Sequence, residues 1–403
     1  MSKKQPKVAL VMDWLTNVGG AEQVLLSIHK LYPDAPIYTS QYNPKGIDWF
    51  KDADVRTGWM KIFPSRLRRF LPVFRRLYFK HLDLSEYDLI ISVTGAEAKG
   101  IKKGNATHLC YCHVPTQYYW QMYDQYVKNP GFGILSPLVR LAFKLLVKPL
   151  RKADYKAAQQ PDQFITISTY AAEQIKKYYG RESVVIPPPV AVEDFSPSND
   201  HRRSRTERTL MFDTEATPGG RSQTYGSDEA VAEGIFETPP LVTTARQVTW
   251  KRLDLAIQAC LQTGQPLKIV GEGPEHKNLQ KLAAGSELIK FYPVTDRTGI
   301  KRQLASSRGY IFPSMEPFGI APVEALAAGI PVIAYQEGGS RDFIQDGVNG
   351  IFFQEQTVAS LAQAIKKFNQ TKFNPAKVSK SADQFSEQNF QSQMRKIIKQ
   401  NIS

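Results

Sequence analysis

Short apolar runs alternate with longer segments of helical spacing along most of the chain. The runs are continuously apolar, as expected for strands that are covered by helices on both faces of a parallel sheet. Strands alternating with helices predict an α/β fold built from doubly wound sheets. The predicted strands of the first half are Val8–Trp14, Asp88–Thr94, Thr107–His113, Gln163–Ser168 and Ser183–Pro187, and those of the second half are Leu241–Arg246, Pro266–Gly273, Gly309–Pro313 and Pro331–Tyr335.

The pattern is interrupted between the two halves. Three consecutive prolines, 187–189, cannot continue a central strand. The segment from Ser196 to about Pro240 is polar, charged and without periodicity, which indicates a loop or a disordered insertion. We therefore expect an N-terminal domain over residues 1–190, a linker with this insertion over 191–240, a C-terminal domain over 241–381 and a final helix over 382–403.

Composition and charge narrow the class of protein. The chain has 403 residues, an apolar content of 42% and a formal net charge of +14. This length suits two or three globular domains, and the charge indicates an anionic partner, such as a phosphate-bearing substrate, an acidic membrane surface or a nucleic acid. The cysteines, Cys110, Cys112 and Cys260, fit neither a disulfide framework nor a zinc site, so we expect a reducing, cytoplasmic compartment.

Neither a signal peptide nor a membrane span is expected. Asp13 interrupts the first apolar run, which we interpret as a strand. The most span-like segment, 131–147, contains Arg140 and Lys144.

A basic segment, residues 61–80, is the largest local source of positive charge. Its apolar residues fall on one helical stripe, which Pro72 can divide in two: Leu67, Phe70, Leu71, Phe74, Leu77 and Tyr78. Such a helix can lie in an anionic membrane interface, or it can pack its apolar face on its own domain with its arginines in water. Both interpretations stay open.

The segment Ile311–Tyr335 carries the densest candidate chemistry. Its pattern predicts a strand, a loop with Glu316, a helix with Glu324 on its first or second turn, and a second strand. The helix start suits a diphosphate, and ionised carboxylates are strong acceptors for sugar hydroxyls. Together these features suit a nucleotide-sugar site, although solvated surface glutamates would give the same pattern.

Three other regions offer candidates. Gly19 and Gly20 form a glycine turn after the first strand, without the spacing of a dinucleotide fingerprint, and either shape the turn or approach a ligand. His113 ends a strand at the edge where open α/β sheets bind ligands, and an aromatic segment follows it. Arg246 and Lys251 flank a loop in the second half, where they can grip a diphosphate or remain surface charges.

The segment EPFGIAPVE, followed by EALAAGIPVIAY and EGGSRDFIQDGVNGIFF, closely resembles the donor-site signature of family-4 glycosyltransferases. This resemblance implies a GT-B fold, in which two Rossmann-like domains face one another across a cleft and the C-terminal helix packs back on the first domain. It extends over about Lys7–Val190 and Leu241–Ser403. The chain keeps the family's Arg246 and Lys251 spacing, but Ala245 and Arg252 replace the flanking glycines.

The resemblance also implies a reaction and its residues. A retaining enzyme of this kind moves a sugar, with a mannose-like hexose as our guess, from a nucleoside diphosphate to a lipid-linked or polysaccharide acceptor, without a cofactor or a metal. The implied catalytic residues are His113, Arg246, Lys251 and Glu316, and the implied donor-binding residues are Gly19, Gly20, Arg246, Lys251, Glu316, Phe318, Gly319, Ile320 and Glu324. We expect a cytoplasmic protein that can associate with the inner face of a membrane.

Other classes explain the sequence less well. A pyridoxal-dependent phosphorylase needs a longer chain, and neither it nor a nucleotide-sugar epimerase explains the spacing of Glu316 and Glu324. A sugar-nucleotide sensor or scaffold, in which the insertion has disabled transfer, is the main alternative. Nucleic acid is not expected as a partner, because no recognition fold accompanies the charge.

Overall fold

The computed structural model describes residues 6–63, 71–128, 136–196, 236, 238–293 and 296–402. It divides into two compact units. The first unit comprises Met1–Pro189 and Glu387–Ser403, and the second comprises Val190–Ser386. Most of the predicted insertion, 197–235, lies outside the described residues.

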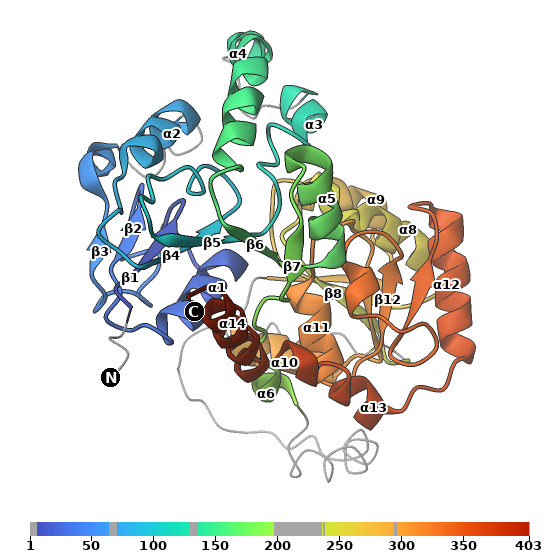
Figure 1. Ribbon diagram of the computed structural model, residues 1–403. Helices are drawn as coiled ribbons and strands as arrows, with labels where there is room; N and C mark the ends of the chain where they lie inside the picture. The colour runs from blue at the N-terminus through green and yellow to red at the C-terminus, as the bar shows by residue number, and fades with distance from the viewer. Residues whose placement is uncertain are drawn as a thin grey trace, which may run out of the picture. The chain divides into compact units, whose positions relative to one another are not determined.

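The first unit contains a parallel sheet in the order β3-β2-β1-β4-β5-β6-β7 (Figure 1). The chain starts in the middle with β1, adds strands on one side, and then adds β4 and its successors on the other side. The carboxyl ends of β1 and β4 therefore diverge at a topological switch point, where α/β sheets bind ligands. The strands are β1 (Val8–Met12), β2 (Ile37–Thr39), β3 (Val55–Arg56), β4 (Leu89–Thr94), β5 (Thr107–Cys112), β6 (Gln163–Thr166) and β7 (Ser183–Val185).

Helices cover this sheet and enclose its apolar strands. Ala9, Val11 and Ile90 are fully buried, as the continuous apolar runs predicted. The helices are α1 (Gly20–His29), the 3₁₀ turn η1 (Gly58–Ile62), α2 (Pro72–His81), α3 (Tyr123–Lys128), α4 (Ser136–Ala157), α5 (Thr169–Tyr179) and α14 (Glu387–Ile402).

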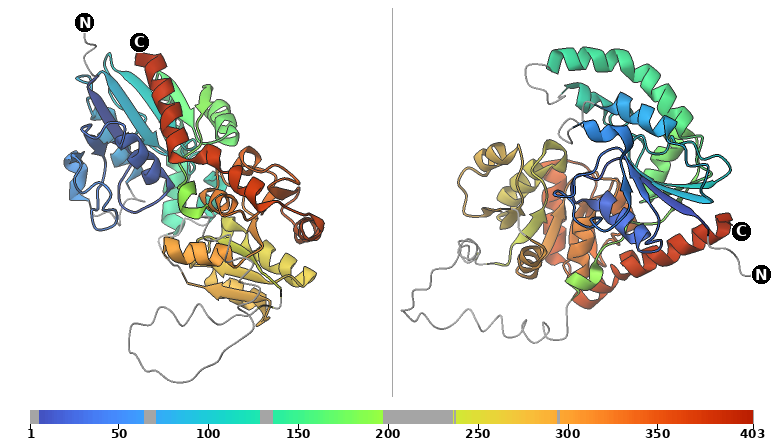
Figure 2. Two further views of the ribbon diagram at one scale, coloured as in Figure 1. Left: turned by 90° about the horizontal axis from the view of Figure 1, so that it is seen from below. Right: turned by 90° about the vertical axis from the view of Figure 1, so that its left-hand side faces the viewer.

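The C-terminal helix α14 packs on the first unit, as predicted. Glu387 accepts a hydrogen bond from Nζ of Lys30, the C-cap of α1, at 2.8 Å, and Gln391 donates to the carbonyl of Ser27 in α1 at 3.2 Å. Both views of Figure 2 show α14 running beside the sheet. The helix starts at Glu387, later than the predicted residue 382, because Asp383–Phe385 forms a 3₁₀ turn, η7.

The second unit repeats the same winding in a parallel sheet of order β10-β9-β8-β11-β12-β13. Its strands are β8 (Leu241–Thr244), β9 (Leu267–Val270), β10 (Ile289–Tyr292), β11 (Gly309–Phe312), β12 (Val332–Tyr335) and β13 (Gly350–Phe353). Its helices and 3₁₀ turns are α6 (Val192–Phe195), η5 (Thr249–Lys251), α8 (Leu253–Thr263), α9 (His276–Ala283), α10 (Arg297–Ala305), α11 (Ile320–Ala327), η6 (Gly339–Asp342), α12 (Val358–Gln370), α13 (Pro375–Lys380) and η7. The switch point of this sheet lies between β8 and β11.

In the described part of the basic segment 61–80, the helix does not keep all its cations on the surface. Residues 64–70 lie outside the described part, and α2 begins at Pro72, where proline's missing N–H has no helical partner to lose. Arg75, expected in water or at a lipid surface, is buried and forms an ion pair with Glu97 at 2.9 Å. Of the predicted apolar stripe, Tyr78 packs in the core and Phe74 is exposed.

Asp13 closes the switch point of the first sheet. It follows β1, and its buried carboxylate accepts hydrogen bonds from the hydroxyl of Thr94 and from the backbone N–H groups of Gly95, Ala96 and Ala98, at 2.8–3.0 Å. Each oxygen therefore has partners from the loop after β4. Asp13 thus ties the loop after β4 to the end of β1 at this switch point.

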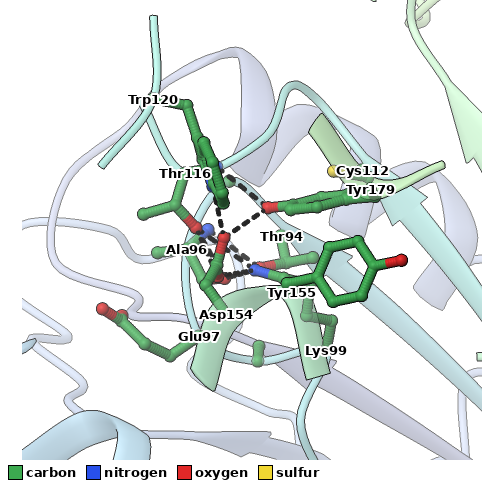
Figure 3. A network of polar contacts seen from close by, with 12 residues as sticks. Thr94, Ala96, Glu97, Lys99, Cys112, Thr116, Trp120, Asp154, Tyr155 and Tyr179 are labelled. Carbon is green, nitrogen blue, oxygen red and sulfur yellow. Dashed lines mark hydrogen bonds and ion pairs between the residues drawn. The ribbon is translucent and has the colours of Figure 1, made fainter. Parts of the chain in front are cut away.

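A second buried carboxylate, Asp154, fixes the end of α4 to the same edge of the sheet (Figure 3). It forms an ion pair with Lys99 at 2.6 Å and accepts hydrogen bonds from Thr116, Trp120 and Tyr179 at 2.7–2.9 Å. Burial alone would lower the pKa of Lys99, but the negative charge of Asp154 outweighs it and raises that pKa. The lysine therefore remains charged in the interior.

In the described part of the chain, no helix combines the length and hydropathy that a membrane crossing needs. The three cysteines are free and buried.

Candidate functional site

The loops after β8 and β11 meet at the switch point of the second sheet and bring two predicted residues together. Lys251 lies in η5 and Glu316 lies in the loop between β11 and α11. Their side chains form an ion pair, with Lys251 Nζ 2.6 Å from Glu316 Oε2. Both side chains remain about a fifth exposed (23% and 22%), so the pair is reachable from solvent.

Neighbouring groups hold Glu316 in place. The hydroxyl of Ser314 donates to its Oε1, and the N–H of Gly339 donates to its backbone carbonyl at 2.8 Å. Gly338 adopts φ +88°, and a Cβ there would lie 2.5 Å from the carbonyl oxygen of Glu316. The glycine pair after β12 therefore permits a close approach that fixes the acidic loop.

Helix α11 follows directly and places its N-terminus beside this loop in the sequence. Gly319 is its N-cap, and the backbone N–H groups of Ile320 and Ala321 lie in its first turn, where an α-helix has no internal acceptors for them. A Cβ on Gly319 would lie 2.6 Å from Pro322 and 3.1 Å from Phe312, so only glycine fits. The result is a helix start that suits a phosphate group.

Glu324 lies on the second turn of α11 and is largely buried. Burial raises the pKa of its carboxyl, and the nearby Arg297 opposes that rise. Arg297 opens α10 and lies 3.9 Å from Glu324 and 2.5 Å from Asp194 of α6. Glu324 is thus a carboxylate with one guanidinium neighbour and a low-dielectric surrounding, which strengthens any hydrogen bond that it accepts.

Arg246 lies in the loop after β8, and its side chain is exposed. Within the described residues, no hydrogen bond or ion pair holds its guanidinium. Its loop is nevertheless fixed, because the buried Gln247 donates to the carbonyl of Gly271 and contacts His276 Nδ1 at 2.8 Å. A Cβ on Gly271 or Gly273 would lie within about 2.3 Å of a carbonyl of this loop, so both glycines shape the turn, as expected.

Arg252 carries strain at one of the two positions where the family was expected to have glycine. Its φ of +51° lies in the left-handed region, which costs a non-glycine residue about 1–2 kcal/mol. Its side chain pairs with Asp254 at 3.1 Å. Ala245 needs no such conformation, since Arg252 and Ala284 are the non-glycine residues with positive φ in the described part.

The side chain of Phe318 has a structural role. Its ring is buried and packs edge to face on Phe343 and Phe385, with ring centroids 5.6 Å apart in each pair. Its predicted contact with a donor would therefore come from the backbone.

The remaining predicted residues lie in the first unit. His113 follows β5, burial lowers the pKa of its imidazole to about 4, and its buried Nε2 has no hydrogen-bond partner in the described structure. Gly19 is the N-cap of α1 with an extended φ of −166°, and Gly20 is the first residue of that helix. Their roles toward a donor, like those of the residues in the second unit, stay predictions.

Sequence reasoning missed the residues that support this site. Ser314, Gln247 and Arg297 each contact a predicted residue or its loop. Ser314 is two residues from Glu316, and that proximity was the available signal. Nothing local in the sequence connects Arg297 to Glu324. The described residues contain no group of three or more His, Cys, Asp or Glu side chains that could hold a metal ion.

Two parallel Rossmann-like units, with a final helix that returns to the first, define the GT-B class, and solved structures agree. HepE from Anabaena, in complex with UDP, aligns with a TM-score of 0.66 over 98% of this chain and 100% of that chain, at 18% identity. The lipopolysaccharide outer core galactosyltransferase WaaB aligns with a TM-score of 0.64 over 97% and 98%, at 15% identity. These similarities confirm the predicted fold.

Comparison of the sequence with protein families and curated proteins narrows the GT-B class further. Residues 228–390 match the model of the family "Glycosyl transferases group 1". D-inositol 3-phosphate glycosyltransferase from Geodermatophilus obscurus is 28% identical over 221 residues, which are 51% of this chain and 45% of that protein. The chain thus covers less than half the length of this curated relative. Over these matched residues the chain has the sequence of a group 1 glycosyltransferase, as the resemblance of its acidic loop predicted.

Proposed function

We propose that this protein transfers a sugar from a nucleoside-diphosphate donor to a glycan acceptor, with retention of the anomeric configuration. The observation that carries the proposal is the solvent-accessible Lys251–Glu316 pair at the switch point of the second sheet. A cation for the diphosphate and a carboxylate for the sugar hydroxyls are what such a donor requires.

The ion pair exchanges partners when the donor binds. Lys251 moves its charge from Glu316 to the diphosphate, and Glu316 then accepts hydrogen bonds from the sugar hydroxyls. Arg246, whose guanidinium has no described partner, supplies a second cation to the same diphosphate. The N–H groups at the start of α11, from Gly319 and Ile320, receive a phosphate oxygen, and Glu324 accepts from the ribose.

In the reaction, the bond between the anomeric carbon and the diphosphate oxygen breaks and a bond to the acceptor oxygen forms. The acceptor proton passes to the leaving diphosphate. Negative charge therefore grows on the diphosphate in the transition state, where Arg246 and Lys251 stabilise it more than in the ground state. His113 is neutral above about pH 5, because its pKa is lowered to about 4, and it would contact the reacting sugar as an uncharged hydrogen-bonding group.

The donor and the acceptor are proposed by chemistry and by analogy. HepE was solved with UDP and WaaB is a galactosyltransferase by name, so uridine donors come first, with GDP-mannose as the donor of a mannose-like hexose. We propose a lipid-linked or polysaccharide acceptor in cell-surface glycan synthesis, by analogy with WaaB, whose name refers to the lipopolysaccharide outer core. We further propose a cytoplasmic site of action beside the membrane.

The test is to incubate the protein with UDP-glucose, UDP-galactose and GDP-mannose and a lipid extract. We expect release of the nucleoside diphosphate and a product heavier by one hexose in mass spectrometry. A Glu316→Gln variant, which keeps shape but donates where the site needs an acceptor, should lose donor use without losing stability.

EDTA should leave the turnover unchanged, since the proposed charges on the diphosphate are Arg246 and Lys251. If EDTA abolished the turnover and an added divalent ion restored it, the result would contradict this mechanism. Donor binding without any turnover would instead support the sensor or scaffold interpretation.

A further inference from the structure

Helix α4 presents an apolar face that the described residues of its own unit leave uncovered. Leu138, Leu141 and Leu145 are 66%, 57% and 70% exposed, and Leu146 is exposed as well. At 100° per residue Leu138, Leu141 and Leu145 fall within about 60° of one another, whereas the buried Val147 lies on the opposite side of the helix. Figures 1 and 2 show the start of this helix standing away from the sheet.

Lysines flank the leucine face. Lys144, Lys148 and Lys152 fall along one border of it, and no Asp or Glu occurs between Ser136 and Ala153. In the described part of the chain none of the three lysines has an ion-pair partner. We define the docking face as Leu138, Leu141, Leu145, Leu146, Lys144, Lys148 and Lys152.

The C-terminal part of α4 is fixed, so the docking face is held in a defined position. Asp154 anchors it through the buried network of Figure 3. Arg151 lies over the ring of Tyr123 at 4.7 Å and donates to the carbonyl of Tyr119. The exposed leucines therefore belong to a helix that the core holds, and their exposure costs free energy that a partner would recover.

Helices α2 and α4 also share a cavity of about 160 Å³ whose lining includes Arg76, Lys80 and Lys156. The carboxylates in that lining, Glu97 and Asp154, are each paired with a buried cation. The three remaining charges are therefore uncompensated and suit anionic headgroups.

We propose that α4 docks on an anionic lipid bilayer, with the leucines in the acyl boundary and the lysines at the headgroup phosphates. Charge decides for a bilayer over a second copy of this chain, because two copies would bring like charges together on a protein of net charge +14. Leucines bordered by lysines with flexible stems are suited to an interface that is apolar on one side and anionic on the other. The proposal assigns the apolar contact with the membrane to α4 instead of the stripe in segment 61–80, where Arg75 is buried, and keeps Arg76 and Lys80 of that segment as cations for the headgroups.

The proposal rests on the proposed function only in that a lipid-linked acceptor would need such docking.

Binding is measured by sedimentation with two kinds of vesicle, one of phosphatidylcholine alone and one of phosphatidylcholine with phosphatidylglycerol. We expect binding to the anionic vesicles that weakens with salt, and little binding to the neutral ones. Leu141→Gln with Leu145→Gln should weaken binding at least about tenfold. Lys144→Gln with Lys148→Gln should weaken it about 25-fold, since each lysine contributes about fivefold.

Matched controls separate this face from the overall charge. Lys366→Gln with Lys372→Gln removes two exposed lysines of the second unit, and Val348→Gln removes an exposed apolar side chain there. Both should leave vesicle binding within about twofold of the wild type. Equal losses in the control and α4 variants, or no vesicle binding by the wild type, would overturn the proposal. A leucine-dependent dimer in size-exclusion chromatography without vesicle binding would also overturn it, in favour of a second copy.

Donor binding by the same variants, measured without lipid, keeps the two proposals distinguishable. The α4 variants should bind nucleotide sugar as the wild type does. Failure of donor binding in the wild type would contradict the proposed function and leave the vesicle result standing.

Discussion

The two units have the same sheet winding, but they treat their switch points in opposite ways. In the first unit the buried Asp13 accepts hydrogen bonds from the facing loop, and the Lys99–Asp154 pair has side-chain exposures of 1% and 3%. In the second unit the Lys251–Glu316 pair is about a fifth exposed, and the guanidinium of Arg246, five residues before Lys251, has no described partner. The polar groups at the first edge are satisfied within the protein, and we propose that those at the second edge exchange partners with a ligand.

The difference in burial between the two ion pairs determines what each can do at its sheet edge. A buried pair that also has several hydrogen bonds cannot release either charge without leaving the other unpaired in a low-dielectric interior. A partly exposed pair loses little when it opens, because water screens both charges. We therefore expect the first to determine folding and the second to determine activity.

The largest expected effect is on the buried pair. Lys99→Met leaves Asp154 buried without its cation, and breaking such pairs typically costs about 3–5 kcal/mol. We expect a loss of this size in the free energy of unfolding, measured by urea denaturation. Lys251→Met is the matched control, and its loss should stay within about 1 kcal/mol. Equal losses in the two variants would show that the edges do not differ as described.

The second-largest effect is expected on turnover, which the partly exposed pair of the second unit should determine. Lys251→Met and Arg246→Ala should each lower kcat/KM for the donor about 100-fold to 1000-fold, as the loss of one preorganised charge contact typically does. Their thermal unfolding should resemble that of the wild type. Unchanged kinetics in either variant, with the fold intact, would remove that residue from the site.

A pH effect on stability should come from the first unit. Burial lowers the pKa of His113 from 6.5 to about 4 in the folded protein, so the unfolded chain binds more protons between these values. The stabilising contribution is therefore full above pH 6.5 and is lost as the pH falls to 4, by about 3 kcal/mol at 1.36 kcal/mol per pH unit. The free energy of unfolding of His113→Gln, followed from pH 7 to 4, should decline less steeply than that of the wild type. A parallel decline would assign the effect to other groups.

The smallest effect concerns Arg297 in the second unit. This exposed residue contributes at most about 1 kcal/mol to stability. It opposes the burial that raises the pKa of Glu324, so Arg297→Ala should raise that pKa further. More of the carboxyl is then protonated at pH 5.5, and the donor affinity of the variant should fall below that of the wild type there and approach it at pH 8. Titration calorimetry at the two pH values tests this, and a pH-independent difference would contradict the role of Glu324.

The sequence alone determined the α/β class, nine of the thirteen described strands, the acidic loop and the helix that follows it, and it missed β2, β3, β10 and β13. Continuous apolar runs are covered on both faces, and the spacing around Glu316 and Glu324 is local, so the strand and helix periods at 309–335 sufficed. The family followed from the same segment, because its signature is contiguous.

Only the tertiary structure decided which charges meet. Lys251 and Glu316 are 65 residues apart, and Lys99 and Asp154 are 55 apart, so no local period connects them. Arg75 looked like a surface cation because the sequence does not show that Glu97 lies opposite it in the folded chain. The exposed leucines of α4 were equally invisible, since helical spacing predicts an apolar face but not whether a neighbouring element covers it. Periodicity reports the local environment of the backbone, whereas burial and charge pairing depend on contacts between segments that only the fold brings together.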